Sequence, residues 1–594
     1  MRLRLLRLRF HRRWRKGQRQ VEAFGSQAEQ QIDQHLFRRF SRLAQVRRFV
    51  LSWAALLLLL IAGVVFQLLA LSGYYQTLKP VPGGVYQEGV VGTFSNANPL
   101  YATSDVDTTV SHLIFAGLFT YNNHNQLVGD LASGYTVNST AKIYTVHLKP
   151  HLTWQDGRPL TSADVRFTYQ TIQDPDAESP LQSSWEGVRI KTPDARTIVF
   201  TLPDALASFP YGLTTGIVPQ HLLARIPPVE LRSADFNSVN PVGAGPFRWR
   251  AVQVSGSDPD SAEQQIVLAP FAHYQGGEPK LQEFVVRAST NQAQLVAAFK
   301  DGQLTGLEGI DGVPSTLKHM SGLTVHSPLL TAATMVFFKT SDGVLADRSV
   351  RQALVRSVNV SQLIAQLGYQ TQVVREPLLP NQLAYQPKLT QPSFNLTAAA
   401  KRLTNDGWIQ STPGSVRHKG KQTLSFSLTA ADTPEYRLVT RALQQAWSQL
   451  GVQLTVQLED AQVFQSALNN HDYQAVLYGI SLGVDPDVFV YWDASQADLR
   501  SANRLNLSEW KNTTASLALE AGRTRLNPKL RIIKYKPFLQ AWQHDTPALG
   551  LYQPRLLYLT NGPVAGLGEH NLNTAADRLD NVQNWEIREA KVTD

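Results

Sequence analysis

Cysteine is absent from all 594 residues, which excludes disulfide bonds and thiolate metal sites. No metal site is predicted from the 14 histidines. A glycine-rich phosphate loop is also missing, so nucleotide hydrolysis would require a separate protein. Low-complexity blocks and repeats of roughly 20 to 50 residues are lacking as well. The sequence therefore predicts neither a metal nor a cofactor.

Charge is scarce over most of the chain and is concentrated at its beginning. Residues 1–49 hold 14 Lys or Arg and 3 Asp or Glu, a local charge of +11. The net charge of the whole chain is +9, so all later residues together sum to −2. This large, nearly neutral region gives no reason to expect nucleic-acid binding. Its length allows two or three compact lobes.

The longest apolar run, Val50 to Leu71, contains 22 residues and no charge. As a helix it would extend about 33 Å, which matches a hydrocarbon core of about 30 Å. Arg47 and Arg48 precede the run, whereas two tyrosines follow it shortly after its end. The positive-inside rule then places the N-terminus in the cytoplasm and the large C-terminal region outside the cell. We therefore predict a cell-membrane protein with a single transmembrane helix over residues 50–73.

A cleaved signal peptide is the alternative, because Ala70-Leu71-Ser72 offers a small-x-small cleavage site. The 49-residue leader and the length of the apolar run favour an uncleaved anchor instead. Arginine and large apolar residues are interleaved at the start of the leader. This segment either lies on anionic lipid headgroups or only enforces the topology.

The segment Tyr144–Ile172 contains a strand, a turn and a capped helix in direct succession. Apolar and polar residues alternate up to Leu148, as in a strand with one buried face. Asp156-Gly157 is a turn signal. Thr161 and Asp164 fit a capping box, so a helix is predicted to begin there. The residues that this helix should bury are Val165, Tyr169 and Ile172.

Within that segment, Asp156–Val165 reads DGRPLTSADV and resembles a signature of the family 5 extracellular solute-binding proteins, the oligopeptide- and dipeptide-binding components of ABC importers. The resemblance continues at intervals over residues 84–560. Other segments similar to the family are Asn98-Pro99-Leu100, Leu113–Leu118, Pro241–Phe247, Asp347–Leu354 and Ala399–Trp408. Packing is the expected role of most of them. The expected role of Gly243 and Gly245 is also structural, because glycine can adopt backbone angles that are closed to other residues.

Strands and helices alternate after Thr331, which indicates an α/β fold with mixed sheets. The resemblance implies a two-lobed clamshell of the periplasmic-binding-protein type, with the ligand between the lobes and the transmembrane helix before them. The predicted parts are a basic cytoplasmic leader (1–49), the transmembrane helix (50–73), a linker (74–83), lobe I (84–328 and 553–594) and lobe II (329–552).

The loop around Asp485-Pro486 resembles the Asp-Pro loop at the mouth of the cleft in this family. In peptide-binding members, a Trp and an Asp shortly before the Asp-Pro help to hold the peptide, and the Asp pairs with its α-ammonium. The matching positions here are Gly479 and Leu482. An ammonium removed from water needs a fixed carboxylate or equivalent acceptors. Either a neighbour such as Asp485 or Asp487 takes that role, or the ligand is not a peptide with a free amine.

Several other residues could contact a ligand between the lobes. Three aromatic residues could line its surface, with core packing as the alternative for each. Ser104 and Asp105 follow the Asn-Pro segment that lies near the cleft in this family, although a solvated loop would explain them equally. The predicted ligand-binding residues are Ser104, Asp105, Trp185, Tyr478, Ser481, Leu482, Asp485, Asp487 and Trp492.

Gly479–Gly483 matches the G-x-S-x-G nucleophile elbow, so a serine hydrolase built on Ser481 is a further candidate function. Pro486 disfavours the immediate strand-to-helix turn that such an elbow requires. Residues that could complete a triad in the chain order of that fold are Asp493, His544 and His570. We predict no enzyme and no catalytic residue.

The resemblance implies an extracellular, membrane-anchored protein that captures a solute between two lobes and delivers it to the permease and ATPase subunits of an ABC transporter. Peptide is the leading ligand because of its frequency in the family. Many members are held to the membrane by a lipidated cysteine, which this chain lacks, and the transmembrane helix would replace it. A ligand sensor or surface interaction protein with the same fold is the alternative. We expect a monomer that binds no nucleic acid.

Overall fold

The computed structural model describes residues 47–72, 76–256, 262–498, 500–501 and 504–593, and the chain divides into two units. The first unit contains helix α3, Arg47–Ser72, and the second is a large body over residues 80–588. Nearly all of the predicted basic leader lies outside the described residues.

Helix α3 contains the whole apolar run. Its window from Arg48 to Leu68 has a mean hydropathy of 2.7 and is long and apolar enough to cross a membrane. Its described side chains from Leu51 to Leu68 are exposed, with Phe66 at 73% and Leu59 at 72%. Such exposure of large apolar side chains is unfavourable in water and favourable in lipid.

The segment predicted as a linker, residues 74–83, is partly a strand. Strand β1, Gln76–Val81, pairs with strand β22, Arg588–Thr593, in a two-stranded sheet. A proline such as Pro80 is tolerated in a strand with a free edge. The partner strand comes from the far end of the sequence, so local composition could not reveal the pairing.

The segments assigned to lobe I form two main sheets. The larger sheet has the strand order β13-β21-β12-β2-β11-β10-β9, and β2 runs parallel to both β11 and β12. An antiparallel sheet has the order β5-β6-β8-β7, and β3 pairs with β4. The strands are β2 Val85–Val91, β3 Phe119–Tyr121, β4 Leu127–Gly129, β5 Ala132–Val137, β6 Ile143–Leu148, β7 Arg189–Asp194, β8 Thr197–Thr201, β9 Phe247–Ser255, β10 Glu263–Pro270, β11 Glu283–Ser289, β12 Gly306–Glu308, β13 Leu323–His326 and β21 Tyr558–Asn561. The helices are α4 Asp105–Ile114, α5 Ser162–Gln173, α6 Gln182–Trp185, α7 Gln220–Leu223, α8 Pro228–Leu231 and α9 Gln292–Lys300.

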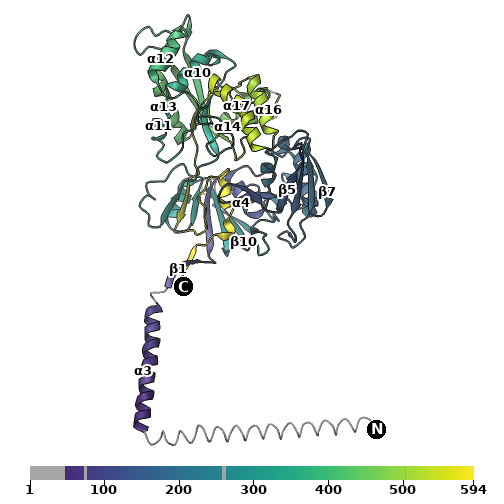
Figure 1. The fold of residues 1–594 in the computed structure, drawn as a ribbon, viewed down its shortest axis with the longest axis vertical. Helices are drawn as coiled ribbons and strands as arrows, with labels where there is room; N and C mark the ends of the chain where they lie inside the picture. The colour runs from purple at the N-terminus through teal and green to yellow at the C-terminus, as the bar shows by residue number, and fades with distance from the viewer. Residues whose placement is uncertain (1–46, 73–75, 257–261, 499, 502–503, 594) are drawn as a thin grey trace, which may run out of the picture. The chain divides into compact units, whose positions relative to one another are not determined.

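Lobe II is built on one mixed sheet with the order β18-β17-β19-β14-β20. Strand β17 runs parallel to β18 and β19, whereas β14 is antiparallel to β19 and β20. The strands are β14 Ala332–Phe338, β15 His418–Lys419, β16 Gln422–Thr423, β17 Ser425–Ala431, β18 Gln453–Glu459, β19 Ala475–Ser481 and β20 Ala548–Tyr552. The helices are α10 Arg348–Arg356, α11 Val360–Ile364, α12 Leu396–Asn405, α13 Pro434–Gln449, α14 Ala461–Asn470, α15 Phe489–Trp492, α16 Thr513–Arg523 and α17 Pro528–Asp545. Figure 1 shows the longer helices of this lobe gathered together, apart from β5, β7 and β10.

Hydrophobic packing separates the two lobes. Three cores draw their residues from 86–330 and 556–587. Two further cores draw theirs from 333–552. Among the described residues, no core mixes these two sets. The cores therefore divide near residues 331 and 553, and the lobe boundaries at 328/329 and 552/553 stay a prediction.

The segment Tyr144–Ile172 folds as its sequence predicts. Strand β6 pairs with β5 and β8, and Gly157 in the following turn has a φ of +87°. Thr161 and Asp164 form the predicted capping box of helix α5. The predicted core residues of this helix, Val165, Tyr169 and Ile172, are all fully buried.

Gly243 and Gly245 are required for a different reason from the one predicted. Neither residue has a positive φ among the described glycines. A Cβ at Gly243 would instead lie 2.0 Å from the carbonyl oxygen of Ile114, and a Cβ at Gly245 would lie 2.7 Å from the carbonyl carbon. Close approach of the turn to the end of helix α4 therefore excludes larger residues.

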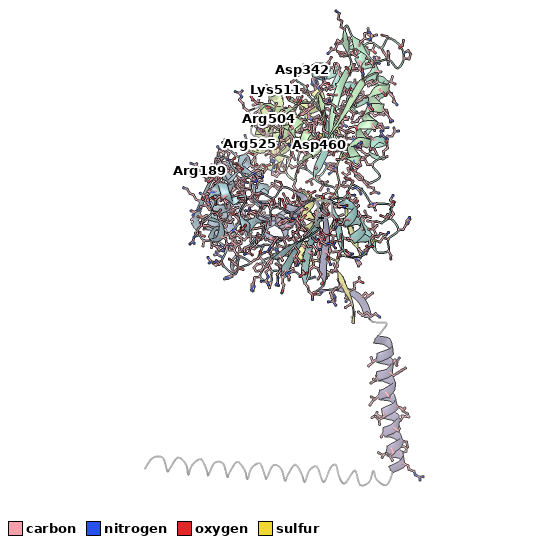
Figure 2. All side chains as sticks on the ribbon, turned by 180° about the vertical axis from the view of Figure 1, so that it is seen from behind. Arg189, Asp342, Asp460, Arg504, Lys511 and Arg525 are labelled. Atoms are coloured by element: carbon pink, nitrogen blue, oxygen red, sulfur yellow. The ribbon has the colours of Figure 1, made fainter. Side chains whose placement is uncertain are left out.

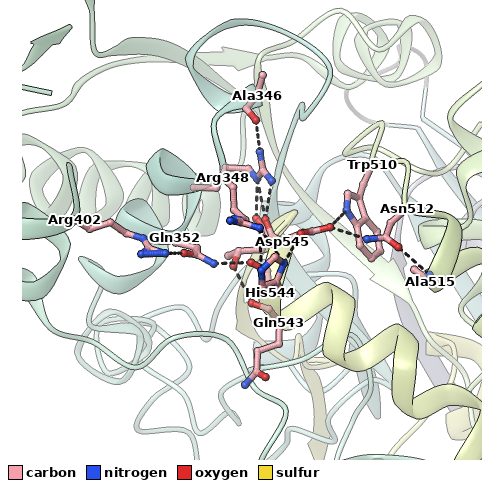
Figure 3. A network of polar contacts seen from close by, with 12 residues as sticks. Ala346, Arg348, Gln352, Arg402, Trp510, Asn512, Ala515, Gln543, His544 and Asp545 are labelled. Carbon is pink, nitrogen blue, oxygen red and sulfur yellow. Dashed lines mark hydrogen bonds and ion pairs between the residues drawn. The ribbon is translucent and has the colours of Figure 1, made fainter. Parts of the chain in front are cut away.

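The segment DRSVRQAL begins helix α10 and ties it to the end of helix α17. The buried Arg351 guanidinium donates hydrogen bonds to the carbonyl oxygens of Leu345, Ala346, Asp545 and Thr546. Figure 3 shows the polar network around Asp545, whose carboxylate also accepts hydrogen bonds from Trp510 and Asn512. These contacts satisfy carbonyl groups at a helix end, so the motif has a structural role here.

Charged side chains of both signs occur on the large body. The labelled residues in Figure 2 include Arg189 on lobe I and Arg504, Lys511, Asp342 and Asp460 on lobe II. This mixture agrees with the small net charge of the region after the leader.

A buried ion pair joins the first strand of lobe I to its final segment. Glu88 of β2 is 0% exposed and pairs with Arg578, which is 4% exposed. Arg578 also donates to the hydroxyl oxygen of Thr109, and the Tyr558 hydroxyl donates to Glu88 at 3.1 Å. The last segment of the chain therefore completes the core of lobe I.

Replacement of Arg578 by Met should leave the Glu88 carboxylate buried without a cation. We expect a loss of about 3–5 kcal/mol in the free energy of unfolding, measured by urea denaturation. The double variant Glu88→Gln/Arg578→Met should recover part of that loss, because it removes both charges. Wild-type stability of the Arg578→Met single variant would contradict this account.

A second buried carboxyl group lies in lobe II, and no cation of the described residues forms an ion pair with it. Glu376 is 0% exposed, and burial raises its pKa from 4.5 to about 8. It accepts hydrogen bonds from the backbone N–H of Gln386. The folded state therefore retains a proton that the unfolded state releases once the pH exceeds about 4.5.

Stability should consequently decrease as the pH rises from about 4.5 to about 8. Glu376→Gln keeps the acceptor and removes the ionisation, so its melting temperature should fall less across this range. Thermal melts at a series of pH values check this, with the exposed Glu186→Gln as the matched control. Parallel pH profiles for wild type and Glu376→Gln would show the expectation to be wrong.

Candidate functional site

A cavity of about 400 Å³ lies where the chain crosses between the lobes. Lobe I contributes residues 124–126 and 570–571, and lobe II contributes residues 379–382 and 483–484. Thr331 and Gln553, at the two crossings, complete the lining. We call this space the hinge cavity. It has walls from both lobes, which is the geometry that closure around a solute requires.

The loop after strand β19 is held rigidly against the hinge cavity. The backbone N–H groups of Leu482 and Gly483 donate to the carbonyl oxygen of Thr331 at 2.9 and 3.1 Å. The Gln382 amide donates to the carbonyl oxygens of Leu482, Gly483 and Asp485 at 3.0–3.3 Å. Backbone and side-chain bonds thus fix this loop to a crossing.

Asp485 is paired with an arginine of the same lobe. Its two carboxylate oxygens accept hydrogen bonds from Arg531 of helix α17 at 2.6 and 2.7 Å. The side chains are 9% and 7% exposed. Burial alone would lower the pKa of Arg531, but hydrogen bonding to Asp485 raises it above its usual value. Asp485 therefore serves to fix the loop on helix α17.

Asp487 links the two lobes directly. Its carboxylate accepts a hydrogen bond from the Ser208 hydroxyl of lobe I at 2.8 Å and one from Arg523 of lobe II at 3.2 Å. Close by, the backbone N–H of Ala207 donates to the carbonyl oxygen of Arg523 at 2.8 Å. The Arg523 guanidinium also lies 4.2 Å from the ring centroid of Phe489. The structure thus shows the lobes in contact at this point.

The remaining residues predicted from this region have different environments. Leu482 is 5% exposed and belongs to a core of lobe II, so only its backbone is close to the hinge cavity. Ser481 is exposed, and its carbonyl oxygen accepts a hydrogen bond from the Tyr491 hydroxyl at 2.7 Å. Tyr478 is half-buried against Phe464, and burial raises its pKa. Neither side chain lines the hinge cavity.

Two predicted aromatic contacts are core residues in the structure. Trp185 is 4% exposed and stacks on Tyr169 with ring centroids 3.9 Å apart. Trp492 is 1% exposed and packs edge-on against Trp542 at 5.9 Å. Both indoles are therefore packed in the core, which was the alternative to a ligand contact for each of them.

Ser104 and Asp105 begin helix α4. The Ser104 hydroxyl accepts a hydrogen bond from the backbone N–H of Asp107, which makes it the N-cap. Asp105 is in the first turn, where a carboxylate stabilises the helix dipole. Both residues thus have a structural role at this helix start, and a ligand contact for them stays a prediction.

The elements around Ser481 do not form a nucleophile elbow. Strand β19 ends at Ser481, but the next helix, α15, begins only at Phe489. Asp493 caps a turn, and His544 hydrogen-bonds to Arg348 and Asp545. Among the described residues, no hydrogen bond joins Ser481 to a histidine. The structure therefore gives no support to the hydrolase alternative.

A second cavity of about 370 Å³ lies within lobe I, and we call it the acid-lined cavity. Burial raises the pKa of Asp130 and of Asp580 to about 6 each. Asp580 accepts a hydrogen bond from His112 at 2.9 Å. Burial opposes the charged form of this histidine, yet Asp580 raises its pKa above the ordinary value. Asp577 completes the acidic lining.

The described residues contain no group of three or more His, Asp or Glu side chains that could hold a metal ion. His147 and His151 are four residues apart, but one lies in strand β6 and the other in the turn beyond it. They therefore do not share a helix face, as a His-x-x-x-His metal site requires.

Sequence patterns did not predict the residues that line the hinge cavity from positions 124–126, 379–382 and 570–571. Nor did they predict Arg523 and Arg531 as partners of the two aspartates. These residues are far apart in the sequence and belong to no periodic pattern. An Asn- and His-rich composition at His124-Asn125 and His570-Asn571 is the only local signal.

Comparisons with known proteins agree with this geometry. The model of the bacterial extracellular solute-binding proteins, family 5, matches residues 126–500. The oligopeptide-binding protein AppA of Bacillus subtilis (strain 168) is 23% identical over 485 residues, covering 80% of this chain and 87% of AppA.

Solved structures share the fold. AppA from Bacillus subtilis in complex with a nonapeptide has a TM-score of 0.69 at 22% identity, covering 86% of this chain and 100% of AppA. NikZ from Campylobacter jejuni in complex with Ni(L-His) has a TM-score of 0.71 at 21% identity, covering 84% of this chain and 99% of NikZ. These matches confirm the two-lobed α/β fold. The chain belongs to the bacterial extracellular solute-binding proteins of family 5.

Proposed function

We propose that this protein captures a solute in the cleft around the hinge cavity and delivers it to the permease of an ABC transporter while anchored to the membrane by helix α3. Its family is that of the extracellular solute-binding proteins, and a relative from Brucella ovis is named as a putative peptide-binding protein of an ABC transporter. The hinge cavity carries the proposal for this chain, because its walls come from both lobes and from both crossings. A solute bound there would contact the two lobes at once.

Peptide is the solute class that we propose first. Its support is the ligand of similar proteins, among them the oligopeptide-binding protein AppA of Bacillus subtilis, solved in complex with a nonapeptide. NikZ holds Ni(L-His) on the same fold, so the scaffold alone does not specify a peptide.

Membrane anchoring is supported by helix α3 and by the charges before it. Arg48 precedes an apolar stretch of suitable length, and the described part of the helix has no acidic residue in its first turn. A spanning helix is a stronger tether than a single acyl chain. Tethering raises the effective concentration of the binding protein at a permease without any added contact.

Lobe closure should depend on the solute for most of its free energy. The direct contact at Asp487, Ser208 and Arg523 consists of a few polar bonds, each worth about 0.5–1.5 kcal/mol, or up to about 3 when charged. A solute that binds the closed form more tightly would shift the equilibrium towards it. The open form then remains accessible for release.

The full chain, extracted from membranes in detergent, should contain a bound solute that native mass spectrometry identifies. Peptides added to solute-free protein should raise its melting temperature, since a ligand at 100 times its Kd stabilises by about 2.7 kcal/mol. Finding neither a bound solute nor stabilisation by any peptide would contradict peptide capture.

Removal of the Ser208 hydroxyl should shift the protein towards the open form. The absence of native cysteine allows spin labels at Val229→Cys in lobe I and Val463→Cys in lobe II, both exposed positions. Double electron–electron resonance should then show a smaller short-distance population in Ser208→Ala. Loss of one hydrogen bond to a carboxylate, worth about 1.5–3 kcal/mol, corresponds to about a ten- to hundredfold change in the closed-to-open ratio.

The control is Ser448→Ala, which removes an exposed hydroxyl whose one hydrogen bond among the described residues is to Gln445 of its own helix. This variant should keep the wild-type distance distribution. An unchanged distribution in Ser208→Ala would mean that the Asp487 contact does not hold the lobes together.

A further inference from the structure

The hinge cavity is lined by uncharged groups. Its polar side chains are amides, imidazoles and one hydroxyl, and among the described residues no Asp, Glu, Lys or Arg lines it. Burial lowers the pKa of His570, which favours the neutral form of this imidazole. A cation entering the cavity would therefore meet no carboxylate among the described lining residues.

Several of these groups have hydrogen-bonding capacity left for a solute. Within the described part of the chain, the side chains of His124, Asn381 and Asn571 make no hydrogen bond to the protein. The Nδ1 atom of His570 is buried and also has no partner. Amide and imidazole groups can each donate or accept, so together they suit hydroxyl and amide groups.

The two carboxylates that follow Val484 in the loop are already engaged, and the Glu569 carboxylate beside His570 lies 3.7 Å from His326 Nδ1 and is not part of the cavity lining. Asp485 forms two short bonds with Arg531, and Asp487 is bonded to Arg523 and Ser208. Separating a buried carboxylate from its arginine costs about 3–5 kcal/mol, which a single ammonium contact would have to offset. The side chain of Leu482, just before this loop, is in a core of lobe II and offers no acceptor for an ammonium.

We propose that the hinge cavity binds an uncharged, hydrogen-bonding end of the solute and disfavours a free ammonium. Two sources share this chemistry: a saccharide, through its hydroxyl groups, and an amino-blocked peptide, through its amide groups. The inference rests on the proposed solute capture and narrows the class of solute. A bare ammonium would lose its hydration in this cavity and gain only dipoles in return.

Calorimetry on the full chain in detergent at a pH of about 7 tests this with three probes: trialanine, N-acetyl-trialanine and maltotriose. Wild type should bind N-acetyl-trialanine or maltotriose at least about tenfold more tightly than trialanine. Preference for the acetylated peptide identifies the blocked-peptide source, and preference for maltotriose identifies the saccharide source.

Val484 offers a matched pair of variants, because its side chain lines the hinge cavity. Val484→Asp introduces a carboxylate and should increase trialanine affinity relative to N-acetyl-trialanine by about tenfold. Val484→Asn has nearly the same shape without the charge and should keep the wild-type order. Thermal melts verify that both variants are folded.

Trialanine binding to wild type at least as tightly as the two probes that lack an ammonium would overturn the inference and leave solute capture intact. Loss of that trialanine binding in Asp580→Asn, but not in the surface variant Asp156→Asn, would assign the ammonium to the acid-lined cavity. The inference would also be overturned by a natural solute, identified by mass spectrometry, whose only ammonium group is held at the hinge cavity. Absence of any bound solute, with no binding of any probe, would instead contradict the proposed function.

Discussion

The double crossing between the lobes is the constraint on which the rest of this structure depends. The backbone N–H of Leu330 donates to the carbonyl oxygen of Pro554 at 2.9 Å, and that of Thr331 donates to Leu572 at 2.7 Å. The two crossing segments are therefore bonded to lobe I and close to each other. The carbonyl oxygen of Thr331 also accepts the bonds that fix the loop at Leu482 and Gly483. Since the same few residues connect the lobes and position the cavity walls, a movement of either lobe must change the shape of the hinge cavity.

The arginine pairs of Asp485 and Asp487 explain how an acidic loop can border an uncharged cavity. Both aspartates lie beside Gly483 and Val484 in sequence, but their carboxylates point to arginines of helices α16 and α17. The pair with Arg531 is almost fully buried and fixes the loop within lobe II. The pair with Arg523 is shared with Ser208, so it contributes to contact between the lobes. The charged groups in this region thus fix the loop and join the lobes. The lining that remains for a solute consists of uncharged polar groups and apolar groups.

Local patterns predicted local structure well, because their physical causes lie within a few residues. The capping box at Thr161 and the alternation in strand β6 depend on neighbours in sequence, and both are confirmed. The pairing of β1 with β22 and the partners of Asp485 and Asp487 depend on residues distant in the chain, and no local pattern encodes them. The two-lobed fold came from resemblance to a family, which conveys such distant pairings without deriving them. The lining of the hinge cavity was missed because surface loops vary with the ligand, whereas family signatures preserve the scaffold.

Separate packing of the lobes makes a solute-driven closure physically reasonable. Lobe I is completed by its last segment through Glu88 and Arg578, and lobe II has its own cores between the two crossings. Each lobe can therefore move as a body without exposing its interior. The contacts found directly between the lobes at Ser208 and Ala207 are polar and few, so closing them releases little free energy. A solute that fills the cavity and satisfies groups such as His570 Nδ1 adds bonds that exist only when both walls are present. The hydrogen-bonding groups that line the cavity, and not the two-lobed fold, then determine which solute can stabilise the closed form.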